Sequence, residues 1–351
     1  MDATQRHKTI LRMLRRHGSV RVTLLAETLG VTQITVRRDI NHLAEQGVLT
    51  RVHGGAVLNE PDNTPLPARQ GEPLPIGQRR TIGMVVPATS YYYREVIEGA
   101  RAAAEAHRIR LVMGVSRYEE AEDKLQIEQL LAQGIEGLLL TPSSSGEDPE
   151  TWQWIADLPV PVVVVERRHH PAADVPSLDY VITDHEHGAT QAVRHLARLG
   201  HRRIALVARP TPTSVWLRRG FEAASAALGL PPDMPRLAAD HQPGSADRIV
   251  DVLLASDTTA LLAHPDEEAV LLLQELRSRG LVVPDDVALV SYDDEFAALS
   301  DVPLTAVAPP RRELGRAAVE LLARRLRQDG TEAMRHIHLL PRLHVRSSTS
   351  G

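Results

Sequence analysis

Gln33, Arg37 and Asn41 lie four residues apart near the start of the chain. Residues at this spacing share one face of a helix. Their side chains are suited to the edges of DNA bases, since arginine pairs with guanine and asparagine or glutamine pairs with adenine. The alternative is a solvated helix face, because two neighbouring arginines alone, Arg37 and Arg38, fit that interpretation as well.

The residues around this trio favour DNA recognition. Thr32 is placed to cap the helix, and Val36, Ile40 and Leu43 recur at the spacing of a buried face. Arg51 and His53, further along the chain, lie in a predicted β-hairpin. The candidate DNA-contacting residues are therefore Thr32, Gln33, Thr35, Arg37, Arg38, Asn41, Arg51 and His53.

Two more helical patterns precede this helix, over about 5–17 and 22–29, with Gly18 and Gly30 as natural stops. Two helices joined by a tight turn that contains glycine form a helix-turn-helix. Residues 48–57 contain two β-prone runs around a Gly-Gly turn, which predicts a hairpin. The fold expected for the first 58 residues is a helix-turn-helix with a β-hairpin wing.

The charge is divided unevenly along the chain. Residues 1–58 carry nine Lys or Arg against four Asp or Glu, a net charge of +5. Because the whole chain has a net charge of −5, the remainder carries −10. A small basic head on an acidic body predicts a polyanion-binding module carried by a body that does not bind polyanions.

Residues 59–79 separate head from body, because five prolines prevent regular helix or strand there. The expected domains are a DNA-binding domain over 1–58, a Pro-rich linker over 59–79, and a body over 80–351. Because this linker is not expected to form a helix, we expect a signal from the body to change the distance between the DNA-binding heads of two copies of the chain.

The body alternates β-prone runs with helical patterns. The runs are 81–86, 110–115, 137–140, 161–165, 203–207, 260–263 and 287–292. The helical patterns are 93–107, 119–133, 184–199, 216–228, 266–279 and 311–328. This alternation predicts parallel sheets covered by helices, and the length predicts two α/β lobes around a cleft.

Several classes of protein and site are disfavoured. The chain has no cysteine, no apolar run of membrane-spanning length and no secretory leader, so we expect a cytoplasmic protein that does not enter a membrane. No phosphate-binding or dinucleotide-binding glycine motif is present, and no cofactor is expected. The alternatives left open are a DNA-tethered, sugar-processing α/β enzyme and a solute-binding protein.

Histidine clusters raise the possibility of a metal site. His185 and His187, two apart at a helix start, point in different directions, and Asp184 fits better as the cap of that helix. His336 and His338 would share one face of a strand, but no third ligand stands near them in the sequence. We therefore expect no metal site.

The head resembles the winged helix-turn-helix of the DeoR family of bacterial transcription regulators. The matching segments are LAETLGVTQITVRRDINHL, residues 25–43, and GVLTRVHGGAV, residues 47–57. The resemblance implies that Thr32–His42 is the recognition helix and that the RVHGGA segment is the wing.

The body resembles the effector domain of the LacI/GalR repressors, which is similar to periplasmic sugar-binding proteins. The matching segments, in the family's order, are 82–100, 134–142, 159–168, 181–207, 220–230, 284–296 and 303–315. The resemblance implies two lobes joined by several crossovers, a ligand enclosed between them, and a homodimer formed through the body, with a tetramer left open.

The same resemblance implies ligand contacts from Glu166, Asp293 and the run Tyr91–Tyr93. Two positions depart from the family: Leu217 replaces a ligand-holding arginine, and His264-Pro265-Asp266 replaces a common Asn-Asp pair. We expect either that the ligand is not a simple sugar or that Trp216, Arg218 or Gln242 compensates by another geometry. The candidate effector-binding residues are Tyr92, Tyr93, Glu166, Trp216, Arg218, Gln242 and Asp293.

These observations predict a sequence-specific transcriptional regulator, expected to be a repressor, that binds double-stranded operator DNA. A small-molecule effector, a sugar or related metabolite, would control its operator affinity.

Overall fold

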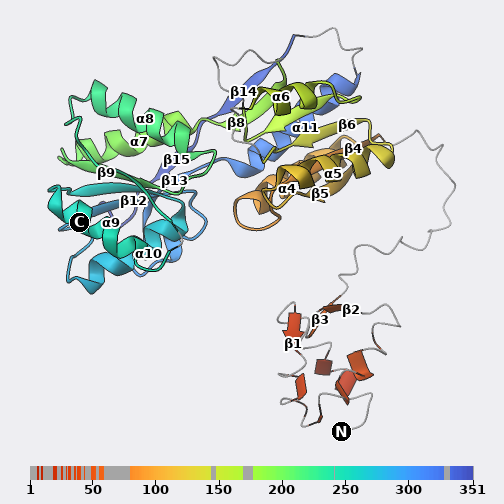
Figure 1. Cartoon of the computed structure of the whole chain (residues 1–351), viewed down its shortest axis with the longest axis horizontal. Helices are drawn as coiled ribbons and strands as arrows, with labels where there is room; N and C mark the ends of the chain where they lie inside the picture. Colours follow the sequence, from red (N-terminus) through yellow and green to blue (C-terminus); the bar gives the residue numbers. More distant parts are fainter. Residues whose placement is uncertain are drawn as a thin grey trace. The chain divides into compact units, whose positions relative to one another are not determined.

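The structure is a computed structural model that divides into two compact units, Met1–Pro75 and Ile76–Gly351. It describes scattered residues between 6 and 58, and then residues 80–143, 148–168, 177–240, 242–327 and 333–350. Figure 1 shows the elements of each unit.

The smaller unit contains helical residues and an antiparallel sheet in the order β1-β3-β2, formed by β1 (Ser19–Arg21), β2 (Leu49–Val52) and β3 (Gly55–Leu58). Strands β2 and β3 pair with Val52 opposite Gly55, which confirms the predicted hairpin. Strand β1 was not predicted. The predicted helical patterns supply the buried apolar residues Ile10, Leu25, Ala26, Leu29, Val36, Ile40 and Leu43.

The first lobe of the larger unit contains a fully parallel sheet in the order β14-β8-β7-β6-β4-β5. Its strands are β4 (Thr81–Val86), β5 (Arg110–Val115), β6 (Gly137–Leu140), β7 (Val162–Val165), β8 (Asp179–Thr183) and β14 (His336–Leu339). Helices α4 (Tyr92–Ala106) and α11 (Arg311–Arg327) cover one face, while α5 (Glu120–Ala132) and α6 (Pro149–Ala156) cover the other.

The second lobe contains a sheet in the order β10-β9-β11-β12-β13-β15. Its strands are β9 (Ile204–Ala208), β10 (Arg236–Ala238), β11 (Ala260–His264), β12 (Ala288–Tyr292), β13 (Thr305–Ala308) and β15 (Arg342–His344). Helices α7 (His185–Arg198) and α8 (Ser214–Ala227) cover one face, while α9 (Ser245–Ala255) and α10 (Asp266–Ser278) cover the other. A short 3-10 helix, η1 (Ala297–Leu299), follows β12.

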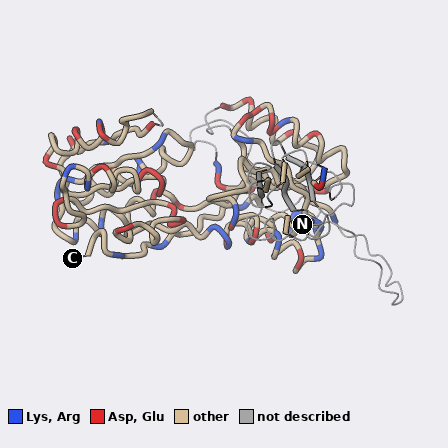
Figure 2. Tube along the Cα trace, turned by 90° about the horizontal axis from the view of Figure 1, so that it is seen from below, with Lys and Arg blue, Asp and Glu red and all other residues tan. Residues whose placement is uncertain are grey.

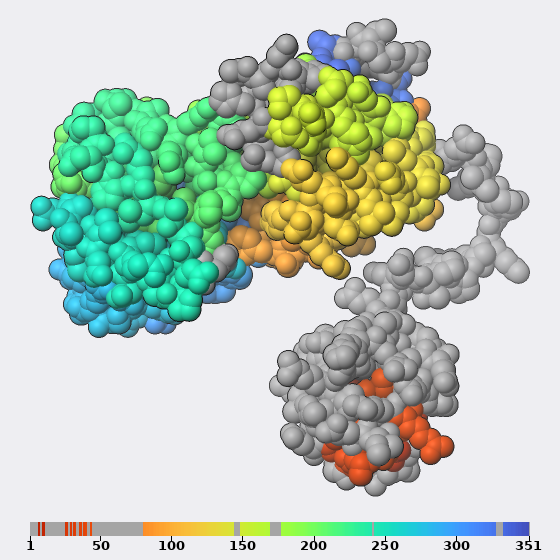
Figure 3. All heavy atoms as spheres, viewed as in Figure 1, coloured from red at the N-terminus to blue at the C-terminus, as the bar shows by residue number. Residues whose placement is uncertain are grey.

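Three crossovers join the two lobes, which lie side by side in the space-filling view (Figure 3). The chain passes to the second lobe between β8 and α7, returns between β13 and α11, and passes over again between β14 and β15. Each lobe therefore contains segments that are far apart in sequence. Two lobes joined by several crossovers are what the resemblance implied.

In the larger unit, the boundaries of the predicted strands and helices are confirmed to within two residues. The prediction of parallel sheets is correct except at the edge of the second sheet, where β15 runs antiparallel to β13. Strands β8, β10 and β13–β15 and helices α6 and α9 were not predicted as separate elements. The Asp184 carboxylate accepts a hydrogen bond from the His187 amide over 2.9 Å, so it caps α7 as predicted.

Charges of both signs are distributed along the larger unit (Figure 2).

Helix α4 packs closely on α11, and two glycines permit this close approach. A Cβ atom at Gly99 would lie 2.0 Å from the Arg312 carbonyl oxygen, and one at Gly315 would lie 1.9 Å from the Val96 carbonyl oxygen. None of the helices that the structure describes is long and apolar enough to cross a membrane.

Candidate functional site

A cavity of about 530 Å³ lies between the two lobes of the larger unit. The first lobe contributes Tyr91, Tyr92, Tyr93, Tyr118, Ser143, Glu166 and Arg167 to its lining. The second lobe contributes His185, residues 209–213, His264, Pro265, Glu267 and Asp293. Most of these residues follow the carboxyl ends of parallel strands, where open α/β sheets bind ligands.

Four lining residues have left-handed backbone conformations, although none is glycine. The φ angles are 52° at Tyr91, 65° at Tyr118, 55° at Glu166 and 105° at Asp293. Such conformations cost free energy and concentrate at functional sites, because the surrounding structure must hold them in place. These residues indicate that the cavity is the functional centre of this unit.

Glu166 follows β7 and is only 5% exposed. Its Oε1 atom accepts hydrogen bonds from the Tyr92 and Thr183 hydroxyls, and Oε2 accepts one from the Thr183 amide over 3.0 Å. Its Oε2 atom also lies 3.4 Å from His185 Nε2. Burial alone would raise the pKa of this carboxyl, but the hydrogen bonds and charge of His185, with Thr183 and Tyr92, lower the pKa to about 2.

His185 connects the two lobes at the first crossover. On one side it faces Glu166 of the first lobe, and on the other its Nδ1 atom lies 2.9 Å from the Tyr292 hydroxyl at the end of β12. Both His185 and Tyr292 are buried. A chain of polar contacts, Glu166–His185–Tyr292, therefore passes from one lobe to the other beside the cavity.

Asp293 follows β12 and is 4% exposed. Its Oδ2 atom accepts a hydrogen bond from the Tyr91 hydroxyl over 3.2 Å, which is a second polar contact between the lobes. Burial, followed by the nearby Asp266 charge, raises the pKa of this carboxyl well above its usual range. Glu166 and Asp293 thus differ, since one is held as a carboxylate and the other is favoured in its protonated form.

Three polar atoms of lining residues are buried without a hydrogen-bond partner among the described residues. They are Arg167 Nε, Thr211 Oγ1 and His264 Nδ1. Burial, with the charges of His185 and Arg209, lowers the pKa of His264 to about 3, so its ring is neutral near pH 7. Because unpaired buried polar groups are costly, these atoms indicate that the cavity binds a polar ligand.

Four of the predicted effector residues, Tyr92, Tyr93, Glu166 and Asp293, line the cavity. The other three do not. Trp216 lies beside the cavity, where the Arg168 guanidinium stacks 3.7 Å from its ring centroid, and Arg218 and Gln242 are exposed. Leu217 is fully buried in the core of the second lobe, because this position of α8 faces the sheet and not the cleft.

The sequence analysis missed Tyr118, Arg167, Arg209, Thr211 and the cavity-facing histidines. Arg209 directly follows β9, and its Nη1 atom lies 2.6 Å from Glu267 Oε2. Position at the end of a strand was the available signal for Arg167 and Arg209, which are the second residue after β7 and the first after β9. The sequence singled out His185 only as a possible metal ligand and His264 only as part of a departure from the family. No group of three or more potential metal ligands is present among the described residues.

In the smaller unit, Thr32 is exposed, and its Oγ1 atom accepts a hydrogen bond from the Thr35 amide over 3.3 Å, which confirms the predicted cap. Arg38 is exposed and Thr35 half-buried, while Arg51 lies in β2. Gln33, Arg37, Asn41 and His53 lie outside the described residues.

Asp39, which follows Arg38, is buried and holds this helix to the first one. Its carboxylate lies 2.8 Å from Arg6 Nε and 3.0 Å from His7 Nε2. Burial would raise the pKa of Asp39, but these two partners lower it overall. Arg38 and Asp39 therefore differ although they are adjacent, since one is exposed and the other joins two helices.

Both units match known domain families. Residues 6–62 match the DeoR-like helix-turn-helix domain, and residues 193–349 match the periplasmic binding protein-like domain. Over 93% of its length, the chain is 28% identical to the arabinose metabolism transcriptional repressor of Geobacillus stearothermophilus, covering 89% of that protein. It is 29% identical to the transcriptional repressor PurR of Aliivibrio fischeri, over 81% of this chain and 86% of the relative.

The chain is a transcriptional regulator. It joins a DeoR-like helix-turn-helix domain to a periplasmic binding protein-like domain. The regulator's fold is similar to that of a LacI-family regulator from Sanguibacter keddieii, with a TM-score of 0.64 and 26% identity over 77% of this chain and 98% of that one. A ribose-bound LacI-family regulator from Enterococcus faecium has the same fold, with a TM-score of 0.63 and 24% identity over 77% and 98% of the two chains.

The hydrogen bonds of Glu166 yield a test of the regulator's stability. We expect Glu166→Gln to lower the free energy of unfolding by roughly 3 kcal/mol at pH 7, the equivalent of a pKa lowered by about two units. A carboxyl whose pKa is lowered on folding stabilises the protein at pH values above its pKa in the unfolded chain. This stabilisation is lost as the pH falls through its pKa in the folded protein, which is about 2.

The melting temperature of the variant should therefore depend less on pH than that of the wild type between about pH 4.5 and pH 2. Differential scanning calorimetry across this range measures both slopes. Equal slopes for the two proteins would contradict the role given to these hydrogen bonds.

Proposed function

We propose that this regulator is a repressor that binds operator DNA through its winged helix and changes its operator affinity when a small molecule occupies the cleft between the lobes. The observation that carries this proposal is the interlobe cavity with three unpartnered buried polar atoms. A regulator needs a ligand that favours one lobe arrangement, and a cavity lined from both lobes supplies that dependence.

The chemistry of the lining supports an effector rich in hydroxyl groups. A guanidinium donates hydrogen bonds to sugar hydroxyls, a carboxylate accepts them, and a tyrosyl hydroxyl does both. Aromatic rings pack on the apolar faces of sugars and bases. One relative is named as a repressor of arabinose metabolism, and one structural neighbour holds bound ribose, so sugars are the class to test first. The cytoplasm is the compartment we propose for this activity.

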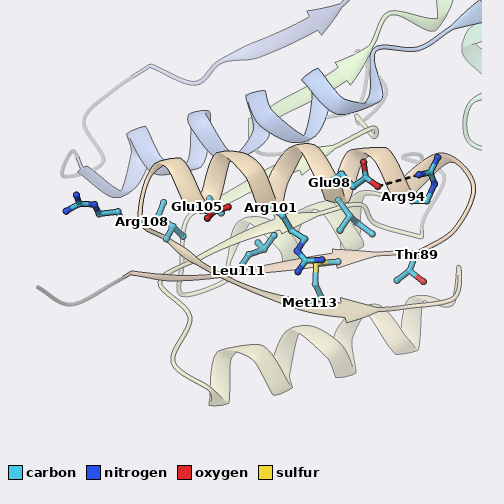
Figure 4. A pocket seen from close by; sticks show the side chains of 11 residues that line it. Thr89, Arg94, Glu98, Arg101, Glu105, Arg108, Leu111 and Met113 are labelled. Carbon is cyan, nitrogen blue, oxygen red and sulfur yellow. Dashed lines mark hydrogen bonds and ion pairs between the residues drawn. The ribbon is translucent and has the colours of Figure 1, made fainter. Parts of the chain in front are cut away.

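We further propose that the regulator is a homodimer and that a second copy covers a groove on the first lobe (Figure 4). The groove, of about 770 Å³, has a floor of Ile97, Leu111 and Met113. Along α4 it carries Arg94, Glu98, Arg101 and Glu105 in alternating charge. Two such helices packed antiparallel about a twofold axis would place Glu98 opposite Arg101 and Arg94 opposite Glu105, so the face complements itself.

The dimer can be tested by charge reversal in the groove. Arg101→Glu should weaken dimerisation by about tenfold or more, because it places like charges opposite each other. The double variant Glu98→Arg, Arg101→Glu should restore it. Analytical ultracentrifugation measures the dimerisation of the single and the double variant. The control is Arg248→Glu, at an exposed position of α9 in the second lobe. If all variants dimerise like the wild type, the second copy does not bind this face.

The recognition helix can be tested at Arg37. If Arg37 reads a base, Arg37→Ala should weaken binding to the selected operator by about 1–3 kcal/mol while changing non-specific binding less. Operators are selected from a random duplex pool, and affinities are measured by fluorescence anisotropy over a series of salt concentrations. Equal losses on specific and non-specific DNA, with a shallower salt dependence, would assign Arg37 to a phosphate instead.

The cleft can be tested at Asp293. Asp293→Ala should leave operator affinity unchanged and abolish its response to any small molecule that shifts the wild type. Screening by thermal shift identifies such molecules, since a ligand at about 100 times its Kd stabilises by roughly 2.7 kcal/mol. A variant that responds like the wild type would show that the effector binds elsewhere.

A further inference from the structure

The loop that follows β12 is fixed rigidly to the second lobe. The Asp266 carboxylate is fully buried and accepts hydrogen bonds from the backbone amides of Asp294, Glu295, Phe296 and Ala297, over 2.6 to 3.3 Å. It also accepts one from the Ser291 hydroxyl. The neighbouring Asp294 carboxylate lies 2.7 Å from Arg346 Nη1. These contacts all belong to the second lobe.

Two acidic side chains of this loop reach the first lobe instead. Asp293 accepts the Tyr91 hydrogen bond inside the cleft. Glu295 lies outside the cleft lining, with Oε2 at 2.9 Å from Arg311 Nη1 and Oε1 at 3.5 Å from Arg94 Nη2. Because they are two residues apart on a loop whose backbone Asp266 holds, the main-chain positions of these two residues are fixed relative to each other.

The Glu295 ion pair is shielded from solvent and borders the cleft. The side chains of Glu295 and Arg311 are only 11% and 7% exposed, so the pair is screened less than a surface pair. Arg311 begins α11 at the second crossover, lies 3.3 Å from Glu95 Oε2 through its Nε atom, and has its guanidinium 5.7 Å from the centroid of the Tyr92 ring. Tyr92 in turn lines the cavity.

We infer that Glu295 is the residue that couples cleft occupancy to the arrangement of the lobes, by holding Arg311 and Arg94 of the first lobe to the clamped loop that also carries Asp293. This inference rests on the proposed function, because it names how the proposed effector site is regulated. Glu295 is a positioning residue, since it acts through Asp293 and does not line the cavity. Its ion pairs stabilise the closed arrangement even when no effector is bound.

The absence of cysteine makes the lobe arrangement directly measurable. Cysteines introduced at exposed positions, Glu128→Cys on α5 and Gln274→Cys on α10, accept spin labels on the two lobes. Pulsed electron resonance then gives the distribution of distances between the lobes. Without any small molecule, Glu295→Gln should raise the population with the longer distance about tenfold, the effect of losing one charged contact.

Two further variants make the comparison specific. Glu295→Asp keeps the charge on a shorter side chain and should give an intermediate distribution. Asp301→Asn is the control, because Asp301 lies in the same part of the second lobe and pairs with Arg277 of that lobe over 2.7 Å. It should match the wild type. Thermal unfolding of each variant shows that it is folded before distances are compared.

The inference is overturned if folded Glu295→Gln has the same distance distribution as the wild type. A separate titration with L-arabinose, D-ribose, adenosine and cytidine as probes tests the proposed function itself. If no probe changes operator binding by the wild type while Glu295→Gln opens the lobes, the choice of effector classes fails and the role of Glu295 stands. If a probe acts on the wild type and acts equally on Glu295→Gln, the coupling role fails while the proposed function stands.

Discussion

The burial of the Glu166 carboxylate between the two lobes is the constraint on which the rest of the cleft depends. A buried charge is tolerated only when hydrogen bonds and an opposite charge compensate for its lost hydration. Here the compensation comes from Tyr92 and Thr183 of the first lobe and from His185 at the crossover. Placing that charge therefore fixes the loop after β4, the end of β8 and the start of α7.

The same constraint explains which polar atoms of the cavity are left to hydrogen-bond a ligand. Both oxygen atoms of Glu166 are occupied by protein groups, whereas Arg167, Thr211 and His264 each present a buried polar atom that lacks a described partner. The acid that follows β7, Glu166, is thus mainly a scaffold for the site. The groups available to a ligand come from its neighbours in both lobes, and a ligand that contacts both will favour one arrangement of the lobes.

Much of this fold could be predicted from the sequence because its strands and helices have strong periodic patterns. The apolar runs that form β4, β6 and β7 are buried on both faces. A short, wholly apolar run such as 137–140 is typical of a central strand of a parallel sheet. Strands β14 and β15 could not be predicted, because they are short, half-exposed and paired with strands more than 30 residues away. Pairing of that kind depends on the crossovers and not on local pattern.

The predicted site residues that line the cavity either follow a correctly predicted strand or belong to the tyrosine run at the start of α4. Glu166 and Asp293 follow such strands, whereas Arg218 and Gln242 were chosen to replace a missing arginine and are exposed. Leu217 shows why, because the start of α8 directs that position into the core of the lobe and leaves residues 209–213, before the helix, to line the cleft. The residue at which a helix begins decides which of its side chains face the core and which face the cleft, because side chains two residues apart lie on different faces of a helix.

The measurement that tests the central claim most directly is the operator affinity of the wild-type regulator with and without a small molecule found by thermal shift. Fluorescence anisotropy on a selected operator gives both dissociation constants. A change of about fivefold or more, the usual range for coupled sites, is the predicted result. An affinity that stays the same while the molecule demonstrably occupies the cleft would contradict the claim that this cavity controls DNA binding.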